Sequence, residues 1–341
     1  MPSDPLVSIV ILNYNGADLL PGLLDSLRGL AYSPYEAIVV ENGSRDNSME
    51  VLLRYPWVRV VQTQQNLGTS GGYNLGVRHS SGEFVLIMNN DIIANRDFVS
   101  VLSRYLVQHP LVGIVQAKMV LPRFGGRLEV CGSFFTRFGL PYHYGYYKTD
   151  GPKYQRSQPV FCAKGACMMF RRNVIERAGG YVFNEDFHCY YEESDLCHRA
   201  WVAGFETHFV ASPPIQHLAG ITIAREEKAG FSLYYYLRNM IFSLTTTLQV
   251  SWLLRIMPLY FAVFLMAMTM ALVTGRRATA AAHWKALTFN LRNLSRIRSQ
   301  RARIQAIRRQ PDRQIFAKVL RNPRLEYFTK TFTSRLADYV D

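Results

Sequence analysis

The sequence predicts an α/β fold: a Rossmann-like, mostly parallel central sheet flanked by helices, followed by a C-terminal helical extension. Three observations support this prediction. In the first 90 residues, short apolar runs alternate with segments of helical spacing, which is typical of parallel strands connected by helices. Polar or glycine-rich clusters follow the runs, where a sheet of this kind binds its ligands. After residue 225 the chain becomes apolar and then strongly basic.

The individual elements follow from local patterns. Strands are expected at 7–12, 35–40, 58–62 and 84–88, and a helix is expected at 18–30, where leucines recur at helical spacing. Residues 92–180 mix helix and strand, and apolar helices are expected at 231–250 and 256–275. We expect no cleavable signal peptide, because no early apolar stretch is present. Five cysteines without framework spacing favour reduced thiols.

Positive charge is concentrated at the C-terminal end. The 341 residues have a formal charge of +14, and residues 276–341 hold 16 Lys and Arg against four Asp and Glu, a net charge of +12. Such a segment favours either nucleic acid or an anionic membrane surface as partner. Because an uncharged apolar run at 256–275 precedes it, we expect a membrane surface and no nucleic acid.

The cluster Asn89-Asn90-Asp91 follows a predicted buried strand. The Asp91 carboxylate there is suited to hold Mg²⁺ or Mn²⁺, with water and diphosphate oxygens completing the coordination. A turn built by the Asx side chains is the alternative.

A second acidic cluster contains Glu192, Glu193 and Asp195. Three carboxylates this close repel one another unless a cation or a proton offsets their charge. One of them is suited to take a proton from an attacking hydroxyl, whereas the alternative is the exposed first turn of a helix. His217 follows further along, and a lone histidine is usually structural.

Residues 66–76 contain four glycines. Glycine lets the backbone approach a diphosphate, and the start of a helix favours anions. The spacing matches neither the dinucleotide-binding fingerprint nor a Walker loop, which argues against an ordinary dinucleotide or ATP enzyme. A loop with a simple helix start is the alternative.

Taken together, these segments resemble the family-2 glycosyltransferases of the GT-A fold, especially bacterial rhamnosyl- and galactofuranosyltransferase-like members. The matching segments lie at 7–16, 40–48, 66–76, 88–91, 165–168 and 191–197, in the order of the family. They extend over roughly residues 6–240. Each segment is weakly specific alone, and the set is highly specific.

The resemblance implies a role for each matching residue. Asp91 and His217 would bind the metal, Glu193 would be the catalytic base with Glu192 beside it, and Asp195 would hold the acceptor or orient the base. The residues implied in nucleotide-sugar binding are Asn13, Asn15, Glu41, Asn42, Asn66, Gly68, Gly71, Gly72, Asn74, Asn89 and Asn90.

The sequence departs from the family pattern in three ways. Asn89 stands where the metal motif has its first Asp, so ligation there would be weak or through water. Glu41 replaces an Asp that contacts the base or ribose, which changes the reach by one methylene. The acceptor-side run Gly-Gly-aromatic-Asp-Glu is stretched over residues 179–185.

The resemblance implies an inverting glycosyltransferase that depends on Mg²⁺ or Mn²⁺. The expected reaction moves L-rhamnose from dTDP-rhamnose to a polyprenyl-linked or polymeric cell-envelope glycan. Transfer from UDP-galactofuranose or another UDP-sugar is the alternative. A catalytically silent nucleotide-sugar-binding scaffold is the non-enzymatic alternative, and a basic nucleic-acid-binding protein is a third.

The expected organisation has three parts. Residues 1–225 form the GT-A domain, with a nucleotide-sugar half at 1–117 and an acceptor half at 118–225; residues 226–275 form membrane-associating helices; and 276–341 form a basic helical tail. We expect 231–250 to lie in the membrane interface and 256–275 to insert or stay shallow. A buried core or dimer helix is the alternative, and a homo-oligomer is left open. The expected location is the cytoplasmic face of the membrane, peripheral or monotopic.

Overall fold

The computed structural model describes residues 4–218, 230–332 and 339 of the chain. Its largest element is an eight-stranded sheet with the order β11-β13-β6-β12-β4-β1-β2-β3. The strands are β1 (Val7–Asn13), β2 (Tyr35–Glu41), β3 (Arg59–Gln62), β4 (Phe84–Asn89), β6 (Val112–Gln116), β11 (Gln158–Pro159), β12 (Cys167–Arg171) and β13 (Glu206–Phe209). The first four strands agree with their predicted bounds to within one residue.

The strands β3, β2, β1 and β4 run parallel. Their carboxyl ends therefore meet at one edge of the sheet, where ligands bind in folds of this kind. β12 lies between β4 and β6 and is antiparallel to both, which the sequence did not predict. This reversal brings the segment before β12 to the same edge, where the amide of Asn89 donates to the carbonyl of Ala166 at 2.9 Å.

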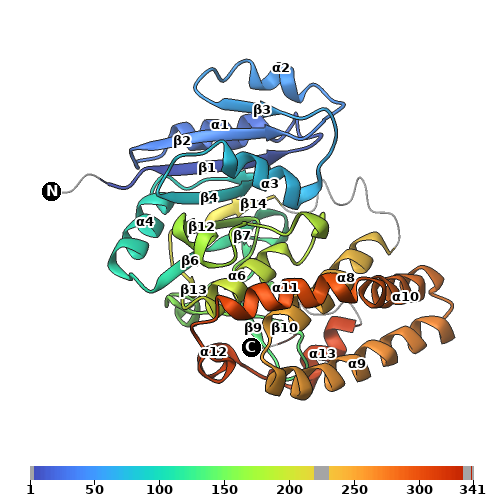
Figure 1. Cartoon of the computed structure of the whole chain (residues 1–341). Helices are drawn as coiled ribbons and strands as arrows, with labels where there is room; N and C mark the ends of the chain where they lie inside the picture. Colours follow the sequence, from blue (N-terminus) through green and yellow to red (C-terminus); the bar gives the residue numbers. More distant parts are fainter. Residues whose placement is uncertain (1–3, 219–229, 333–338, 340–341) are drawn as a thin grey trace.

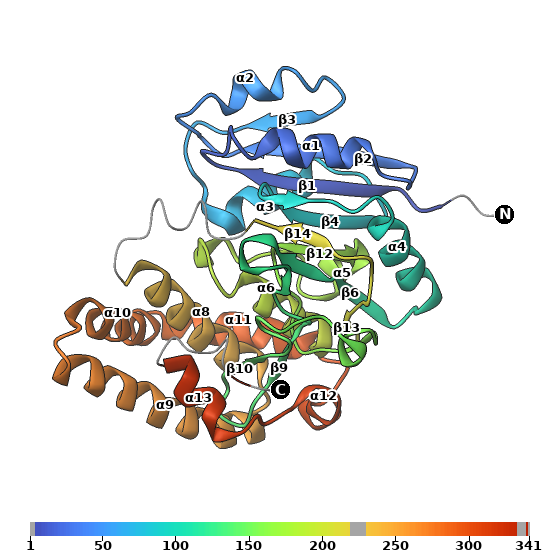
Figure 2. The same ribbon diagram turned by 180° about the vertical axis from the view of Figure 1, so that it is seen from behind.

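Helices cover both faces of the sheet. One face carries α1 (Leu20–Arg28), α2 (Ser48–Leu52) and α4 (Phe98–Gln108), and the other carries α3 (Gly68–Arg78), α5 (Asn173–Arg177) and α6 (Glu192–Val202). Figure 1 is seen from the side of α3, and Figure 2 is seen from the side of α1. The predicted α/β sheet flanked by helices is confirmed, and the helix predicted at 18–30 is α1.

A second sheet of four short strands lies next to the large one. Its order is β5-β14-β7-β8, formed by β5 (Ile92–Ile93), β14 (Ile215–His217), β7 (Met119–Leu121) and β8 (Arg127–Leu128). Asp91 precedes β5, Glu129 follows β8 and His217 ends β14, so this sheet brings together three segments that are distant in the sequence. Shorter elements are the hairpin β9 (Ser133–Phe135) and β10 (Pro141–His143) and the 3₁₀ turns η1 (Pro122–Phe124), η2 (Pro152–Tyr154) and η3 (Glu185–Phe187).

The C-terminal helices gather beside α6 (Figure 1). They are α8 (Phe231–Thr247), α9 (Val250–Val273), α10 (Arg277–Arg292), α11 (Leu294–Ala306), α12 (Asp312–Val319) and α13 (Leu325–Phe332). α8 packs against α6, α10 and α11, and α12 packs against α6. The basic segment that begins at residue 276 is thus largely packed against the rest of the protein.

The expectation that residues 231–250 lie in the membrane interface is wrong. Leu237, Met240 and Leu244 of α8 are buried in the core shared with α6. Arg238 and Asn239, which would be costly in a bilayer, are also buried. They are tolerated inside the protein because they form hydrogen bonds with backbone carbonyls.

Among the described residues, α9 is the single helix long and apolar enough to cross a membrane. It has 24 residues, and 28% of its most apolar window, of mean hydropathy 2.2, is buried. The helix starts at Val250, six residues before the predicted start, so Pro258 lies in its interior and not in a first turn. One side of α9 packs Ile256, Tyr260 and Phe264 against the core.

Candidate active site

A buried hydrogen-bond network connects the loops that follow β1, β2 and β4. Asn13 Nδ2 donates to Glu41 Oε2 at 2.7 Å, and Asn90 Nδ2 donates to Asn13 Oδ1 at 2.8 Å. The other oxygen of Glu41 accepts the amide of Ser44 at 2.7 Å. All three predicted residues are therefore brought together, and their side chains hold the loops at the carboxyl edge of the sheet. Asn15 accepts the amide of Arg45 at 2.8 Å and connects the same loops near the surface.

A second network fixes the start of α3. Asn42 Oδ1 accepts the amide of Leu67 at 3.0 Å, and Asn42 Nδ2 donates to Asn66 Oδ1 at 3.0 Å. Asn66 Oδ1 also accepts the amide of Gly68 at 2.7 Å. The N-terminus of α3, with its partial positive charge, is thereby held beside the end of β2, a position that favours an anion.

The glycine-rich stretch 66–76 is a short loop followed by helix, because α3 begins at Gly68. Gly71 and Gly72 lie inside α3. A Cβ at Gly72 would come within 2.3 Å of Leu12 Cδ1, so this glycine allows α3 to pack closely on β1. Asn74 exchanges hydrogen bonds with the backbone of Phe183 at 2.8 and 2.9 Å. These contacts give Gly72 and Asn74 packing roles, and their predicted contact with the nucleotide sugar stays a prediction.

Asp91 and His217 lie side by side, and both are buried. Asp91 Oδ1 is 3.1 Å from His217 Nε2, yet it has no hydrogen-bond partner among the described residues. On its other side, His217 Nδ1 donates to Glu129 Oε2 at 2.6 Å. Glu129 was not predicted, and the signal available was a single acid within the apolar run 128–131, which needs a partner once buried.

The two carboxylates determine the charge of His217. Burial lowers the pKa of its imidazole, but the adjacent Asp91 carboxylate and the hydrogen-bonded Glu129 carboxylate outweigh burial and raise this pKa to about 9. Burial also opposes ionisation of Glu129, but the His217 partner, with Lys164, lowers the pKa of this carboxyl. In the protein without a metal, an imidazolium therefore lies between two carboxylates.

The residues around Asp91 fit a divalent cation. Two neighbouring ligands of an octahedral ion with bonds of about 2.1 Å lie about 3 Å apart, close to the separation of Asp91 Oδ1 and His217 Nε2. The buried carboxylate oxygen without a hydrogen bond is an available ligand, and Glu129 can orient the imidazole. Within 4–218, 230–332 and 339, no group of three or more His, Cys, Asp or Glu side chains is arranged to hold a metal.

The acidic pair begins α6. Glu192 is buried, and its Oε2 has no hydrogen-bond partner within the part of the chain that the structure describes. Burial and the charge of Glu193 raise the pKa of Glu192 well above its usual range. Burial raises the pKa of Glu193 as well, but Lys164 and the amide of Gly165 oppose that rise. Both carboxyls therefore hold a proton more tightly than an exposed glutamate does, and Lys164 acts on both to favour the ionised form.

One segment, residues 164–166, connects the acidic pair to the metal candidates. Lys164 Nζ is 3.7 Å from Glu129 Oε1, and this lysine side chain is 44% exposed. Desolvation lowers the pKa of Lys164, but the charges of Glu129 and Glu193 outweigh it and raise this pKa. Ala166 is bonded to Asn89 in the polar cluster before Asp91.

Tyr73 of α3 lies at the same edge of the sheet. Burial raises the pKa of its phenol, and the charges of Asp91, Glu192 and Glu193 act in the same direction. The Tyr73 hydroxyl donates to Asn89 Oδ1 at 3.0 Å, which occupies that oxygen.

Comparison with known proteins identifies the family. Residues 8–179, half of the chain, match the Glycosyl transferase family 2 domain. The chain belongs to glycosyl transferase family 2. This confirms the prediction from the motifs that the chain is a member of a family of glycosyltransferases. The match ends before Glu192, Glu193 and His217, so the roles of these residues stay predictions.

Two relatives show what the chain is similar to. The low-salt glycan biosynthesis hexosyltransferase Agl10 of Haloferax volcanii is 30% identical over 203 residues, which are 57% of this chain and 61% of that protein. The N-acetylglucosaminyl-diphospho-decaprenol L-rhamnosyltransferase of Mycobacterium tuberculosis is 24% identical over 256 residues, which are 67% of this chain and 81% of that protein. The chain thus spans less than two thirds of the first relative.

Solved structures share the fold. S. aureus TarS in complex with UDP-GlcNAc has a TM-score of 0.52 at 15% identity, over 71% of this chain and 67% of that chain. GalNAc-T7 with UDP, GalNAc and Mn²⁺ has a TM-score of 0.60 at 14% identity, over 74% of this chain and 49% of that chain. At these identities the likeness concerns the fold alone, and it confirms the predicted GT-A architecture.

Asp195 of this family-2 protein is not directed at the metal candidates. Its Oδ2 accepts from Arg199 Nε at 2.7 Å, and both side chains are almost fully buried. Arg199 also donates to the carbonyls of Ala178, Tyr181 and Val182. This pair holds residues 178–182 against α6, and the predicted role of Asp195 toward the acceptor or the base stays a prediction.

The loop before the acidic pair is strained and firmly held. His188, Tyr190 and Tyr191 have φ values of 61°, 64° and 71°, a region that costs free energy for residues other than glycine. Asn239 Nδ2 of α8 donates to the carbonyls of Phe187, Cys189 and Tyr190 at 2.7–3.1 Å.

The other side of this loop contacts α3. The amide of Ser70 donates to the carbonyl of His188 at 3.0 Å. Arg238 orients Asn239 by donating to its Oδ1 at 2.9 Å, and it stacks on Tyr235 with 4.5 Å to the ring centroid. The strained loop is therefore held between the nucleotide side of the domain and the C-terminal helices.

We expect Asn239→Ala to destabilise this loop. The substitution leaves buried carbonyls without a donor, so the free energy of unfolding should fall by about 2 kcal/mol, and amide hydrogen exchange should increase at residues 186–191. Thr245→Ala is the matched control, because the Thr245 hydroxyl, on the same helix, donates only to carbonyls of that helix among the described residues. Equal destabilisation by both variants, with unchanged exchange in the loop, would contradict the role given to Asn239.

Proposed function

We propose that the protein is an inverting, metal-dependent glycosyltransferase that moves a sugar from a nucleotide diphosphate to a lipid-linked or polymeric cell-envelope glycan. The observation that supports this best is the convergence of two groups at one edge of the sheet. One is the acid–imidazole pair Asp91 and His217, which fits a divalent cation. The other is Glu193, a carboxyl with a raised pKa.

The donor we favour is dTDP-L-rhamnose. The M. tuberculosis relative is named for L-rhamnosyl transfer to a diphospho-decaprenol-linked acceptor, which also favours a lipid-linked acceptor here. A UDP-sugar, including UDP-galactofuranose, is the second candidate, since TarS, which shares the fold, has been solved with UDP-GlcNAc.

Asp91 and His217 are the residues that would hold Mg²⁺ or Mn²⁺. The ion would supply positive charge that offsets the negative charge of the departing diphosphate. Glu129 would keep the imidazole oriented through Nδ1.

Glu193 would act as the general base on the acceptor. Its carboxylate takes the proton of the acceptor hydroxyl while that oxygen forms a bond to the anomeric carbon. The bond from the anomeric carbon to the diphosphate oxygen breaks, its electron pair leaves with the nucleotide diphosphate, and the configuration inverts. Lys164 opposes the rise in the pKa of Glu193 and so favours its ionised form.

We expect Glu193→Gln to bind the donor normally and to lose transfer by about 10²-fold or more, the usual scale for general-base catalysis. Donor binding is measured as thermal stabilisation of the protein, and transfer is measured as formation of the glycosylated product. Glu176→Gln, which changes an exposed acid on α5, is the control and should keep full turnover. Near-normal transfer by Glu193→Gln excludes it as the base.

We expect Asp91→Asn to abolish the stabilisation that a nucleotide sugar gives in the presence of Mn²⁺. A bound ligand raises stability by mass action, so a panel of dTDP- and UDP-sugars, each with and without Mn²⁺, also identifies the donor. Asp97→Asn, an exposed acid, should behave as the wild type. Unchanged metal dependence in Asp91→Asn counts against Asp91 as a metal ligand. If the wild-type protein binds the donor but neither transfers nor hydrolyses it, the catalytically silent scaffold is supported.

We further propose that α9 attaches the protein to the cytoplasmic face of an anionic membrane, lying in its plane. The side of α9 away from the core exposes Leu254 (70%) and Met266 (52%). Arg255, Arg276 and Arg277 are exposed beside this apolar surface, and they suit anionic headgroups. A helix packed along one side into the protein is better placed to lie in the interface than to span the bilayer.

We expect the double variant Leu254→Glu, Met266→Glu to lose vesicle binding by more than tenfold, because each apolar side chain contributes roughly 1.5–3 kcal/mol when buried. The measurement is flotation with phosphatidylglycerol vesicles, compared with phosphatidylcholine. The control is Leu53→Glu, an equally exposed leucine (77%) in the N-terminal half. Equal flotation of all variants, or salt-sensitive DNA or RNA binding in place of flotation, would overturn the membrane proposal.

A further inference from the structure

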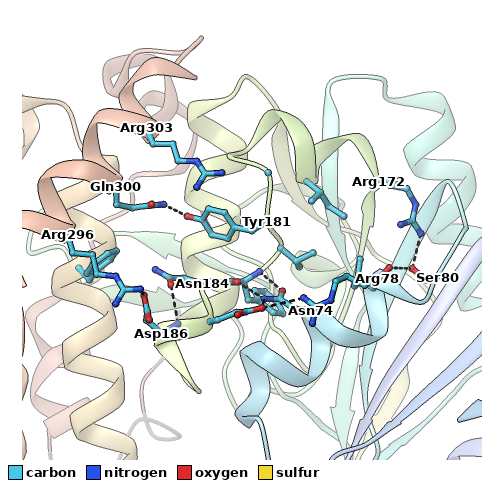
Figure 3. Close-up of a pocket in the computed structure, with 17 residues that line it drawn as sticks. Asn74, Arg78, Ser80, Arg172, Tyr181, Asn184, Asp186, Arg296, Gln300 and Arg303 are labelled. Carbon is cyan, nitrogen blue, oxygen red and sulfur yellow. Dashed lines mark hydrogen bonds and ion pairs between the residues drawn. The ribbon is translucent and has the colours of Figure 1, made fainter. Parts of the chain in front are cut away.

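The structure contains a cavity that most of the predicted site residues do not line. It has a volume of about 530 Å³ and is enclosed by the second half of α3, residues 180–186 and α11 (Figure 3). Of the residues predicted for donor, metal or base, only Asn74 lines it, and its amide is bonded to the backbone of Phe183. The predicted donor, metal and base roles therefore do not account for the residues that line this cavity.

Positive charge dominates this cavity. Its lining contains four arginines from three segments: Arg78 of α3, Arg172 after β12, and Arg296 and Arg303 of α11. The same lining contains only two carboxylates, Glu185 and Asp186, which pair with Arg78 and Arg296, respectively. Two positive charges are left over. Neither Arg172 nor Arg303 forms an ion pair with a carboxylate in the described part of the chain.

Both of these arginines are oriented by neutral neighbours. Arg172 donates to Ser80 Oγ at 2.9 Å and to the carbonyl of Gly82. Arg303 lies 5.7 Å from the ring centroid of Tyr181, whose hydroxyl accepts from Gln300 Nε2 at 2.5 Å. Figure 3 shows Arg303 and Gln300 projecting from α11 toward Tyr181, with Arg172 and Ser80 across the cavity. Two nitrogens of Arg172 are already bonded within the protein, and the remaining N–H groups of the two guanidinium ions can donate to phosphate oxygens.

Part of the lining is apolar. Val77, Ile175 and Phe242 are among the residues that line the cavity. A ligand that fills it would therefore combine about two negative charges with an apolar portion. A carboxylate supplies one negative charge, whereas a phosphate monoester or a diphosphate supplies about two near neutral pH.

We propose that this cavity binds a phosphate-bearing ligand through Arg172 and Arg303. The ligand's source is either the diphosphate of an isoprenoid-linked glycan or a free phosphate compound. The first source rests on the proposed function, and two observations favour it: the apolar lining, and the position of α11 in the same helical bundle as the exposed apolar side of α9. The cavity would then hold the carrier diphosphate while the sugar end reaches the acceptor side of the domain.

The test is calorimetric titration of the full chain at low salt, in EDTA so that metal-dependent donor binding does not contribute. The probes are inorganic pyrophosphate and farnesyl diphosphate. Arg303→Gln and Arg172→Gln should each weaken binding by at least about tenfold, the scale of a charge-assisted hydrogen bond. Arg303 is exposed, so its substitution should leave the unfolding temperature unchanged even if Arg172→Gln lowers it.

The control is Arg298→Gln, which removes an exposed charge from the same helix outside the cavity. Wild-type binding by Arg303→Gln, or an equal loss in Arg298→Gln, would overturn the proposal. If farnesyl diphosphate binds at least about tenfold tighter than pyrophosphate, the lipid-linked source is supported; equal affinities support a free phosphate compound. Because the readout is binding, a wild type that binds pyrophosphate but transfers no sugar would refute the proposed function and leave this site intact.

Discussion

The candidate site depends on an alternation of charge that extends from the sheet edge to the acidic pair. Acidic and basic side chains alternate along it, in the order Asp91, His217, Glu129, Lys164 and Glu193. The carboxylates beside His217 raise the pKa of its imidazole to about 9, and Glu129 and Glu193 raise the pKa of Lys164. Removing one member would therefore change the pKa of the next. These side chains form one electrostatic unit, although they come from distant parts of the sequence.

A second constraint is the cost of the loop that carries the base. The backbone of residues 188–191 adopts conformations that are unfavourable for histidine and tyrosine. Such strain persists only where the surroundings hold it, and here Asn239 and Arg238 do so from inside α8. Buried polar side chains need partners, and the loop carbonyls need donors, so each group satisfies the other. This explains why two polar residues interrupt an otherwise apolar helix.

The sequence predicts what is local and misses what depends on distant partners. The strands at 7–12 and 84–88 were predicted closely because hydrophobic runs bounded by turn residues are local signals. Glu129 was missed because its significance comes from His217, 88 residues later. Burying Arg238 in lipid would cost free energy. In the structure, its partners are backbone carbonyls from a segment about fifty residues earlier. The reversed strand β12 has no local signature, and it creates the connection through Lys164.

These constraints meet in residues 178–191. The Asp195–Arg199 pair holds the start of this segment, its middle lines the cavity of Figure 3, and its end leads into the acidic pair. The segment contacts α3 on one side and the C-terminal helices on the other. A displacement of α8 or α11 would therefore reach Glu193 through backbone that has few alternative conformations. The C-terminal helices in this sense help to determine the position of Glu193.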